Sequence, residues 1–187
     1  MGLSYGAEAA LLTAVRDPRI TAVVALAPTD VVWEGHHQND ADLRRSKWTW
    51  HGEPLPFIPL DRTWVPDRPI PAFAPYYARS REIADAATVQ AARIPAERFL
   101  GDLVLVAGGD DQVWPSVSHA RAIAETRTAH GLDTAIVEDP TAGHPITLPG
   151  ELPANSARPY LVGGDPNAPK RLGALAWPAI RKALNLH

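Results

Sequence analysis

The sequence predicts an α/β fold, because apolar runs of strand length alternate with segments of helical periodicity. Residues 20–26 form a nearly continuous β-branched apolar run, residues 103–107 form a second one, and residues 134–137 form a weaker third. Such runs are typical of parallel strands that are buried on both faces. A helical segment, residues 118–130, lies between the last two runs, and this order implies a right-handed parallel crossover. We therefore expect parallel strands with flanking helices.

Further helices are predicted at both ends of the chain and in its middle. Residues 5–15 place apolar side chains at helical spacing, and Pro18 ends this helix because the residue before a proline disfavours helical geometry. Residues 80–92 are predicted as one further helix, and residues 172–186 as the last.

An excursion, residues 36–75, interrupts the alternation of strands and helices. It carries seven prolines after residue 53 and the large aromatic residues Trp48, Trp50, Phe57, Trp64 and Phe73. Prolines fix φ and remove backbone donors, so they exclude a regular helix or a central strand. We expect only a short ribbon around residues 48–52. Two interpretations stay open, a surface lobe held together by its aromatic residues and a lobe that covers a substrate.

Composition limits the chain to a few classes of function. Its 187 residues suit one domain, residues 1–187, with 45% hydrophobic and 21% charged residues. A net charge of -3 offers no basic footprint for nucleic acid. There is no cysteine, which excludes disulfides and a cysteine nucleophile, and no motif implies a metal or another cofactor. No apolar run is long enough to span a membrane and none is typical of a signal peptide, so we expect a cytoplasmic protein.

The pentapeptide Gly2-Leu3-Ser4-Tyr5-Gly6 matches the nucleophile-elbow pattern G-x-S-x-G. The tight strand-to-helix turn of an elbow demands small residues at Gly2 and Gly6, and it holds the serine backbone strained. The pentapeptide alone is also compatible with a simple helix cap. A following helix and then an apolar strand favour the elbow.

An acid and a histidine follow in the loops after the next two predicted strands. Asp110 and Asp111 come after residues 103–107, and His144 comes after residues 134–137. The carboxyl ends of parallel strands are where open sheets place functional groups. The two aspartates are also common turn formers, Asp110 more so. His119 is expected at the surface.

Ser4, Asp111 and His144 follow one another in the order of the α/β-hydrolase triad. In such a triad His144 takes the proton of Ser4, and Asp111 fixes the histidine tautomer. The backbone N–H of Tyr5 is then expected to donate to the developing oxyanion.

The chain resembles a known family in motifs spread over most of its length. These motifs are Gly-Leu-Ser4-Tyr-Gly-Ala-Glu8, Val-Val-Trp33-Glu-Gly35, the stretch from Trp48 to Pro56, Ile94-Pro-Ala-Glu97, Gly108-Gly-Asp-Asp-Gln-Val-Trp-Pro115, Ala142-Gly-His144, and Gly163-Gly-Asp-Pro166 followed by Trp177. They resemble the carboxy-terminal domain shared by acyl-CoA thioester hydrolases and bile acid-CoA:amino acid N-acyltransferases.

The resemblance implies a serine-dependent hydrolysis of an acyl-CoA or acyl ester. The transferases of the family carry a cysteine nucleophile and the thioester hydrolases a serine, so Ser4 implies hydrolysis. We expect Trp48, Trp50 and Trp114 to wall the acyl site. A dienelactone-hydrolase-like esterase or peptidase is the alternative activity, since a triad does not select its leaving group. The alternative outside the enzymes is a non-catalytic fragment.

In relatives the nucleophile lies deep inside the hydrolase domain, whereas Ser4 is the fourth residue here. We therefore expect the carboxy-terminal part of an α/β-hydrolase fold, with the N-terminal half of the sheet missing and no strand before Ser4. Such a fragment is expected to lack one oxyanion donor, to turn over slowly or not at all, and to associate through an open sheet edge.

Overall fold

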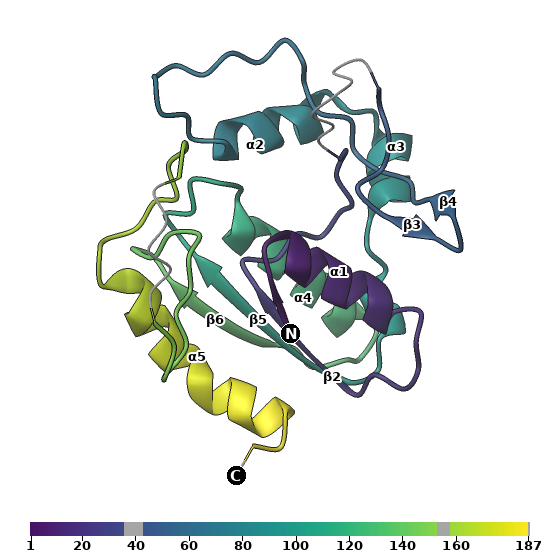
Figure 1. The fold of residues 1–187 in the computed structure, drawn as a ribbon. Coiled ribbons are helices and arrows are strands. Elements are labelled where there is room, and N and C mark those ends of the chain that lie inside the picture. The colour runs from purple at the N-terminus through teal and green to yellow at the C-terminus, as the bar shows by residue number, and fades with distance from the viewer. Residues whose placement is uncertain (36–42, 153–157, 187) are drawn as a thin grey trace.

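The computed structural model describes residues 1–35, 43–152 and 158–186 of the chain. At its centre lies a four-stranded sheet in the order β1-β2-β5-β6, with every neighbouring pair parallel. The strands are β1 (Gly2–Leu3), β2 (Ala22–Leu26), β5 (Asp102–Gly108) and β6 (Ala135–Asp139). Figure 1 shows helices on both faces of this sheet. The expected α/β class is therefore confirmed.

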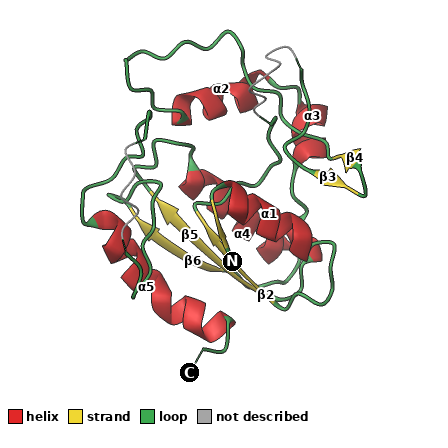
Figure 2. Cartoon of the chain, viewed as in Figure 1, coloured by secondary structure: helices red, strands yellow, loops and turns green. Residues whose placement is uncertain are grey.

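Alternate residues of the two central strands bury their side chains on opposite faces. Val23 lies beside Leu103 and Val24 beside Val104 in the β2–β5 register. The Val23 and Leu103 face packs with α1 (Tyr5–Ala14) and α4 (Ser116–Ala129). The Val24 and Val104 face packs with α5 (Ala168–Ala183). Helices α1 and α4 thus cover one face of the sheet, and α5 covers the other (Figure 2).

The predicted helix over residues 80–92 is wrong in extent, because the structure has two helices there. These are α2 (Ala74–Ile83) and α3 (Ala86–Ala92). Asp85 stops the first and caps the second, since its carboxylate accepts the Thr88 N–H at 2.8 Å. A short 3₁₀ turn, η1 (Ala96–Arg98), then leads to β5.

A strand precedes Ser4, which corrects the expectation that none would. Gly2 and Leu3 form β1, pairing with Ala25 and Leu26 of β2. This pairing reaches the turn, because the Ser4 N–H donates to the Leu26 carbonyl at 2.8 Å. The start of the first helix is thus tied to the central sheet.

The excursion contains a hairpin, as the sequence predicts around residues 48–52. Its strands are β3 (Thr49–Trp50) and β4 (Glu53–Pro54), joined by His51 and Gly52. Both turn residues have positive φ, 51° and 86°, as a tight two-residue hairpin turn requires. Residues 36–42 of the excursion lie outside the described residues.

The described excursion and α2 form a lobe with an apolar core of its own. Trp33, Ile58, Leu60 and Tyr77 are buried there together with Trp114. In Figure 1 α2 lies beyond the carboxyl ends of β5 and β6. Two backbone hydrogen bonds of 2.8 Å tie the end of the excursion to this edge, from Phe73 to Gln112 and from Leu161 to Pro71.

None of the described helices combines the length and the apolar character needed to cross a membrane.

Candidate active site

Ser4 has the backbone geometry of a nucleophile elbow. Its φ of 59° and ψ of -125° lie in a region that residues with a side chain rarely adopt. It stands between β1 and α1, and its hydroxyl does not cap the helix. The strained turn therefore presents the hydroxyl at the carboxyl edge of the sheet, without a capping contact that would occupy it.

Gly2 and Gly6 differ in how strictly the turn requires them. A Cβ at Gly2 would lie 2.1 Å from the carbonyl oxygen of Gly6, so no larger residue fits there without moving the backbone. A Cβ at Gly6 would meet nothing within 4 Å. The expectation that both glycines are needed to avoid collisions is wrong for Gly6, because its missing side chain would point out from the exposed first turn of α1.

Asp111 and His144 lie in contact at the same carboxyl edge of the sheet. His144 Nδ1 lies 2.9 Å from Asp111 Oδ2 and 3.1 Å from Oδ1. Both side chains are almost fully buried, with 3% and 1% of their area exposed. Asp111 Oδ1 also accepts the N–H of Val113 at 2.8 Å, which orients the carboxylate. A buried carboxylate in this position stabilises one tautomer of the ring, with the proton on Nδ1 and the lone pair on Nε2.

Asp110 has different partners. Its Oδ2 accepts the N–H of Gly164 at 2.7 Å and its Oδ1 accepts from the Gln112 amide at 2.7 Å. It therefore fastens the loop after β5 to the segment before α5, away from the histidine ring.

The backbone around His144 is held by close packing. The His144 N–H donates to the Val162 carbonyl at 2.7 Å. A Cβ at Gly143 would lie 2.2 Å from the carbonyl oxygen of Gly163, so only glycine permits this approach. The Trp114 ring lies edge-on to the His144 ring, with centroids 5.6 Å apart. Together these contacts leave the ring little freedom to reorient.

A cavity of about 270 Å³ joins Ser4 and His144. Its lining residues come from β1 and the elbow, from the excursion and α2, from the loops after β5 and β6, and from the segment before α5. They are Leu3, Ser4, Tyr5, Phe73, Tyr76, Tyr77, Val113, His144, Arg158 and Tyr160. Among the described residues no hydrogen bond joins the Ser4 hydroxyl to His144. In structures without substrate such contacts are often long and close only when substrate binds.

Trp48 and Trp50 lie elsewhere, which corrects their expected place in the acyl-site wall. They line a separate cavity of about 180 Å³ against Leu12 of α1 and Arg16, which follows that helix. They therefore lie against the second half of α1, and neither lines the cavity of Ser4. Trp114 is fully buried behind His144, and it is not among the lining residues of the Ser4 cavity.

Tyr5 contributes to the candidate site with both its backbone N–H and its side chain. Its N–H belongs to the first turn of α1, where amides have no acceptor within the helix. Its hydroxyl lies 2.8 Å from that of Tyr77. Burial raises the pKa of Tyr5 far above its ordinary value and that of Tyr77 to about 12. Both hydroxyls therefore stay neutral at physiological pH.

His119 is buried rather than exposed, which corrects the sequence prediction. It contacts Asp30, whose carboxylate also binds Arg81 through two hydrogen bonds of 2.6 and 2.9 Å. Burial opposes ionisation of Asp30, but these contacts hold its pKa below the usual range. This second histidine–aspartate pair joins α4 to the loop after β2, and through Arg81 to α2, and it does not line the Ser4 cavity.

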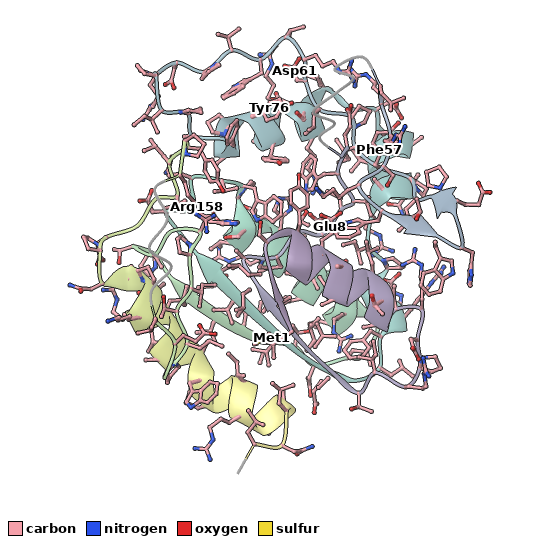
Figure 3. The ribbon with its side chains drawn as sticks, in the orientation of Figure 1. Met1, Glu8, Phe57, Asp61, Tyr76 and Arg158 are labelled. Carbon is pink, nitrogen blue, oxygen red and sulfur yellow. The ribbon has the colours of Figure 1, made fainter. Side chains whose placement is uncertain are left out.

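Sequence reasoning missed Tyr76, Tyr77, Arg158 and Tyr160. They lie in α2 and before α5, far from the elbow in the chain, and no local pattern distinguishes them. Figure 3 shows Tyr76 on α2 and Arg158 on the segment between the sheet and α5. Among the described residues no group of histidine, aspartate and glutamate could hold a metal ion.

The family model described as BAAT / Acyl-CoA thioester hydrolase C terminal matches residues 1–169. Among curated proteins none matches the chain.

Proposed function

This chain belongs to the BAAT and acyl-CoA thioester hydrolase C-terminal family, and from that membership we propose that it cleaves acyl-CoA thioesters through an acyl-serine intermediate. The observation that carries the serine mechanism is the contact of Asp111 with His144, which lines the same cavity as Ser4. We further propose that residues 1–187 form a single catalytic domain of the α/β-hydrolase type. The cytoplasmic location, the low turnover and the association through a sheet edge stay predictions.

In the acylation step His144 Nε2 takes the proton of the Ser4 hydroxyl as the oxygen attacks the thioester carbonyl. A C–O bond forms, and the N–H of Tyr5 donates to the oxygen that becomes negative. The C–S bond then breaks, and the CoA thiolate leaves with the proton that His144 carried. Asp111 keeps the ring oriented and stabilises its positive charge between these transfers.

In the deacylation step water replaces the thiol. His144 takes a proton from the water as its oxygen attacks the acyl-serine carbonyl. The C–O bond to Ser4 breaks, and His144 returns the proton to the serine oxygen. The products are the free acid and the original enzyme, so no other reactant is needed.

The test is hydrolysis of a panel of acyl-CoAs by wild type and Ser4→Ala, with release of CoA measured by a thiol reagent. We expect Ser4→Ala to lower turnover by at least about 10³-fold, because the nucleophile is lost. Circular dichroism of the variant serves as the folding control.

A panel of p-nitrophenyl esters separates the main proposal from the esterase alternative. Ester hydrolysis that depends on Ser4, without hydrolysis of any acyl-CoA, would favour the dienelactone-hydrolase-like activity. Thioester turnover that Ser4→Ala leaves unchanged would refute the serine mechanism.

A further inference from the structure

The hydrogen bond between the hydroxyls of Tyr5 and Tyr77 leaves one hydroxyl proton of the pair without an acceptor. The two oxygens lie 2.8 Å apart, so one hydroxyl donates and the other accepts. Each neutral phenol carries one proton, and neither hydroxyl has another hydrogen-bond partner among the described residues. Both phenols are neutral, because burial raises the pKa of each. One O–H group of the pair is therefore free to donate.

This free O–H group belongs to a side chain in the wall of the catalytic cavity. Tyr5 and Tyr77 both line the cavity that Ser4 and His144 also line. Tyr77 is buried, with 4% of its area exposed. A buried donor without an acceptor costs free energy, so an acceptor that a bound substrate brings into the cavity is stabilised there.

The relative acidity of the two phenols indicates which hydroxyl donates into the cavity. Burial raises the pKa of Tyr77 to about 12 and that of Tyr5 much further. After burial, the contact between the hydroxyls lowers the pKa of Tyr77 and raises that of Tyr5, as it does when Tyr5 is the donor. Tyr77 is the stronger acid, so it forms the stronger hydrogen bond to an anion. The bond that it accepts from Tyr5 strengthens this donation, because hydrogen bonds in a chain polarise one another.

Aromatic and cationic contacts hold both phenol rings in place. The Tyr77 ring lies edge-on to the rings of Trp33 and Trp114, with centroids 4.8 and 5.5 Å away. The Tyr5 ring lies edge-on to Trp114 at 5.3 Å, and the ammonium of Lys47 lies 4.4 Å from its centroid. Donors fixed in advance need no reorganisation when charge develops, and this is how an oxyanion is stabilised most effectively.

We propose that Tyr77 is a further catalytic residue, whose hydroxyl is the second donor to the oxyanion beside the backbone N–H of Tyr5, and that the Tyr5 hydroxyl positions it. This inference rests on the proposed serine mechanism and adds a residue to it. As Ser4 attacks the carbonyl, the C=O electron pair moves to the oxygen, which accepts both hydrogen bonds. Tyr77 keeps its proton throughout, and the bonds weaken when the C=O bond forms again and the leaving group departs. The donor that the sequence predicts to be missing thus comes from α2.

The test is Tyr77→Phe, assayed with acetyl-CoA and with p-nitrophenyl acetate, which carry the same acyl group. Phenylalanine keeps the ring and its packing and removes only the hydroxyl. We expect kcat to fall by about 10²- to 10³-fold, the usual effect of losing one oxyanion donor, with KM unchanged.

Ser80→Ala is the matched control. It also removes a buried hydroxyl from α2, one that binds the Asp61 N–H and the Tyr76 carbonyl and does not line the cavity. We expect it to lower the thermal stability and to leave kcat unchanged. An equal loss of kcat in Ser80→Ala and Tyr77→Phe would trace the effect to α2 as a whole and overturn the inference.

Tyr5→Phe separates the donor from the residue that positions it. In this variant Tyr77 keeps its proton but accepts no hydrogen bond from Tyr5, so we expect kcat to fall by only about 2- to 10-fold, the size of one ordinary hydrogen bond. The double variant should be no slower than Tyr77→Phe, because the Tyr5 hydroxyl acts only through Tyr77. A larger loss in Tyr5→Phe than in Tyr77→Phe would transfer the donor role to Tyr5 and overturn the assignment.

Labelling with diethyl p-nitrophenyl phosphate tests Tyr77 independently of acyl-CoA hydrolysis. Ser4 displaces p-nitrophenolate from phosphorus as His144 takes the serine proton, and the phosphoryl oxygen gains negative charge in the same site. Mass spectrometry locates the label on Ser4. Slower labelling of Tyr77→Phe than of wild type supports the inference even if no acyl-CoA is hydrolysed, in which case only the proposed function fails.

Two results would count against the role of Tyr77. Unchanged kcat and unchanged labelling in Tyr77→Phe would overturn the inference and leave thioester hydrolysis intact. A wild type that neither turns over the two substrates nor is labelled at Ser4 would overturn both proposals.

Discussion

Two adjacent aspartates, Asp110 and Asp111, show how one position along the chain changes the role of a carboxylate. Asp111 points inward to His144 Nδ1, and Asp110 points to the N–H of Gly164. Successive residues of a turn face in different directions, so only one of the pair can reach the ring. The geometry therefore supports Asp111 as the acid of the proposed triad.

Asp111→Asn is expected to lower kcat by about 10³- to 10⁴-fold, because the amide stabilises the wrong tautomer of His144. Asp110→Asn is the matched control. Its amide oxygen can still accept the Gly164 N–H, and we expect kcat to change by only a few-fold. Steady-state kinetics with one acyl-CoA would check both variants, and a larger loss for Asp110→Asn than for Asp111→Asn would reverse the assignment.

At the scale of elements, the elbow is a junction of β1 and α1 that depends on one glycine more than on the other. The Gly2 Cα lies against the Gly6 carbonyl, whereas the Gly6 Cα faces open space. β1 is short, and its pairing with β2 through Gly2 and Leu3 holds the strained Ser4 in place. A shift of the backbone at Gly2 therefore displaces the Ser4 hydroxyl directly.

Gly2→Ala is expected to lower the free energy of unfolding by about 1–3 kcal/mol, as is usual for overpacking, and to reduce turnover. Gly6→Ala should raise the free energy of unfolding by about 0.5–1 kcal/mol, because alanine favours the helix more than glycine does. Urea denaturation of the two variants beside wild type gives the comparison. Equal destabilisation by both substitutions would contradict the packing described for the elbow.

At the scale of the whole molecule, Glu8 joins the sheet layer to the lobe. It lies on α1 one turn after Ser4, is fully buried, and accepts the N–H of Trp33 at 3.3 Å. Figure 3 shows it at the end of α1 that faces the lobe. Its Oε2 has no hydrogen-bond partner among the described residues. Burial raises the pKa of the Glu8 carboxyl to about 8, and the Trp33 N–H, the Trp48 side chain and the charge of Lys47 offset this only in part.

This raised pKa predicts that the protein loses stability as the pH increases. Below pH 4.5, the pKa of Glu8 in the unfolded chain, the Glu8 carboxyl is protonated in both the folded and the unfolded state. Between pH 4.5 and about pH 8 it is protonated only in the folded state. The free energy of unfolding should therefore fall across this window, by an amount on the order of a few kcal/mol. Glu8→Gln should remove this part of the pH dependence, as measured by urea denaturation from pH 5 to pH 8.5.

Glu97→Gln is the control for that prediction. Its hydrogen bonds with Arg93 lower the pKa of the Glu97 carboxyl, so its contribution is lost only as the pH falls, in the opposite direction to that of Glu8. The Glu97→Gln protein should keep the decline between pH 5 and pH 8. An unchanged decline in Glu8→Gln would show that another group causes it.

The sequence by itself determined the strands β2, β5 and β6, most of the helices and the order of the candidate triad, but not the short strand β1. Continuous apolar runs, helical spacing and the glycine pattern around Ser4 act over a few residues, and local geometry follows from them. Asp111 and His144 were predictable for the same reason, since each follows directly after a strand. The break at Asp85 was not, because the capping hydrogen bond to Thr88 competes there with a continuous helical pattern.

Only the tertiary structure decided which residues surround Ser4. Tyr5 and Tyr77 share a hydrogen bond across 72 positions of the chain, and Arg158 reaches the same cavity from beyond β6. The excursion brought Phe73 to the site and carried Trp48 and Trp50 away from it, although all three look alike as aromatic residues in a proline-rich stretch. Side-chain type and spacing encode burial and local geometry, but the packing of distant elements selects which buried or charged groups meet.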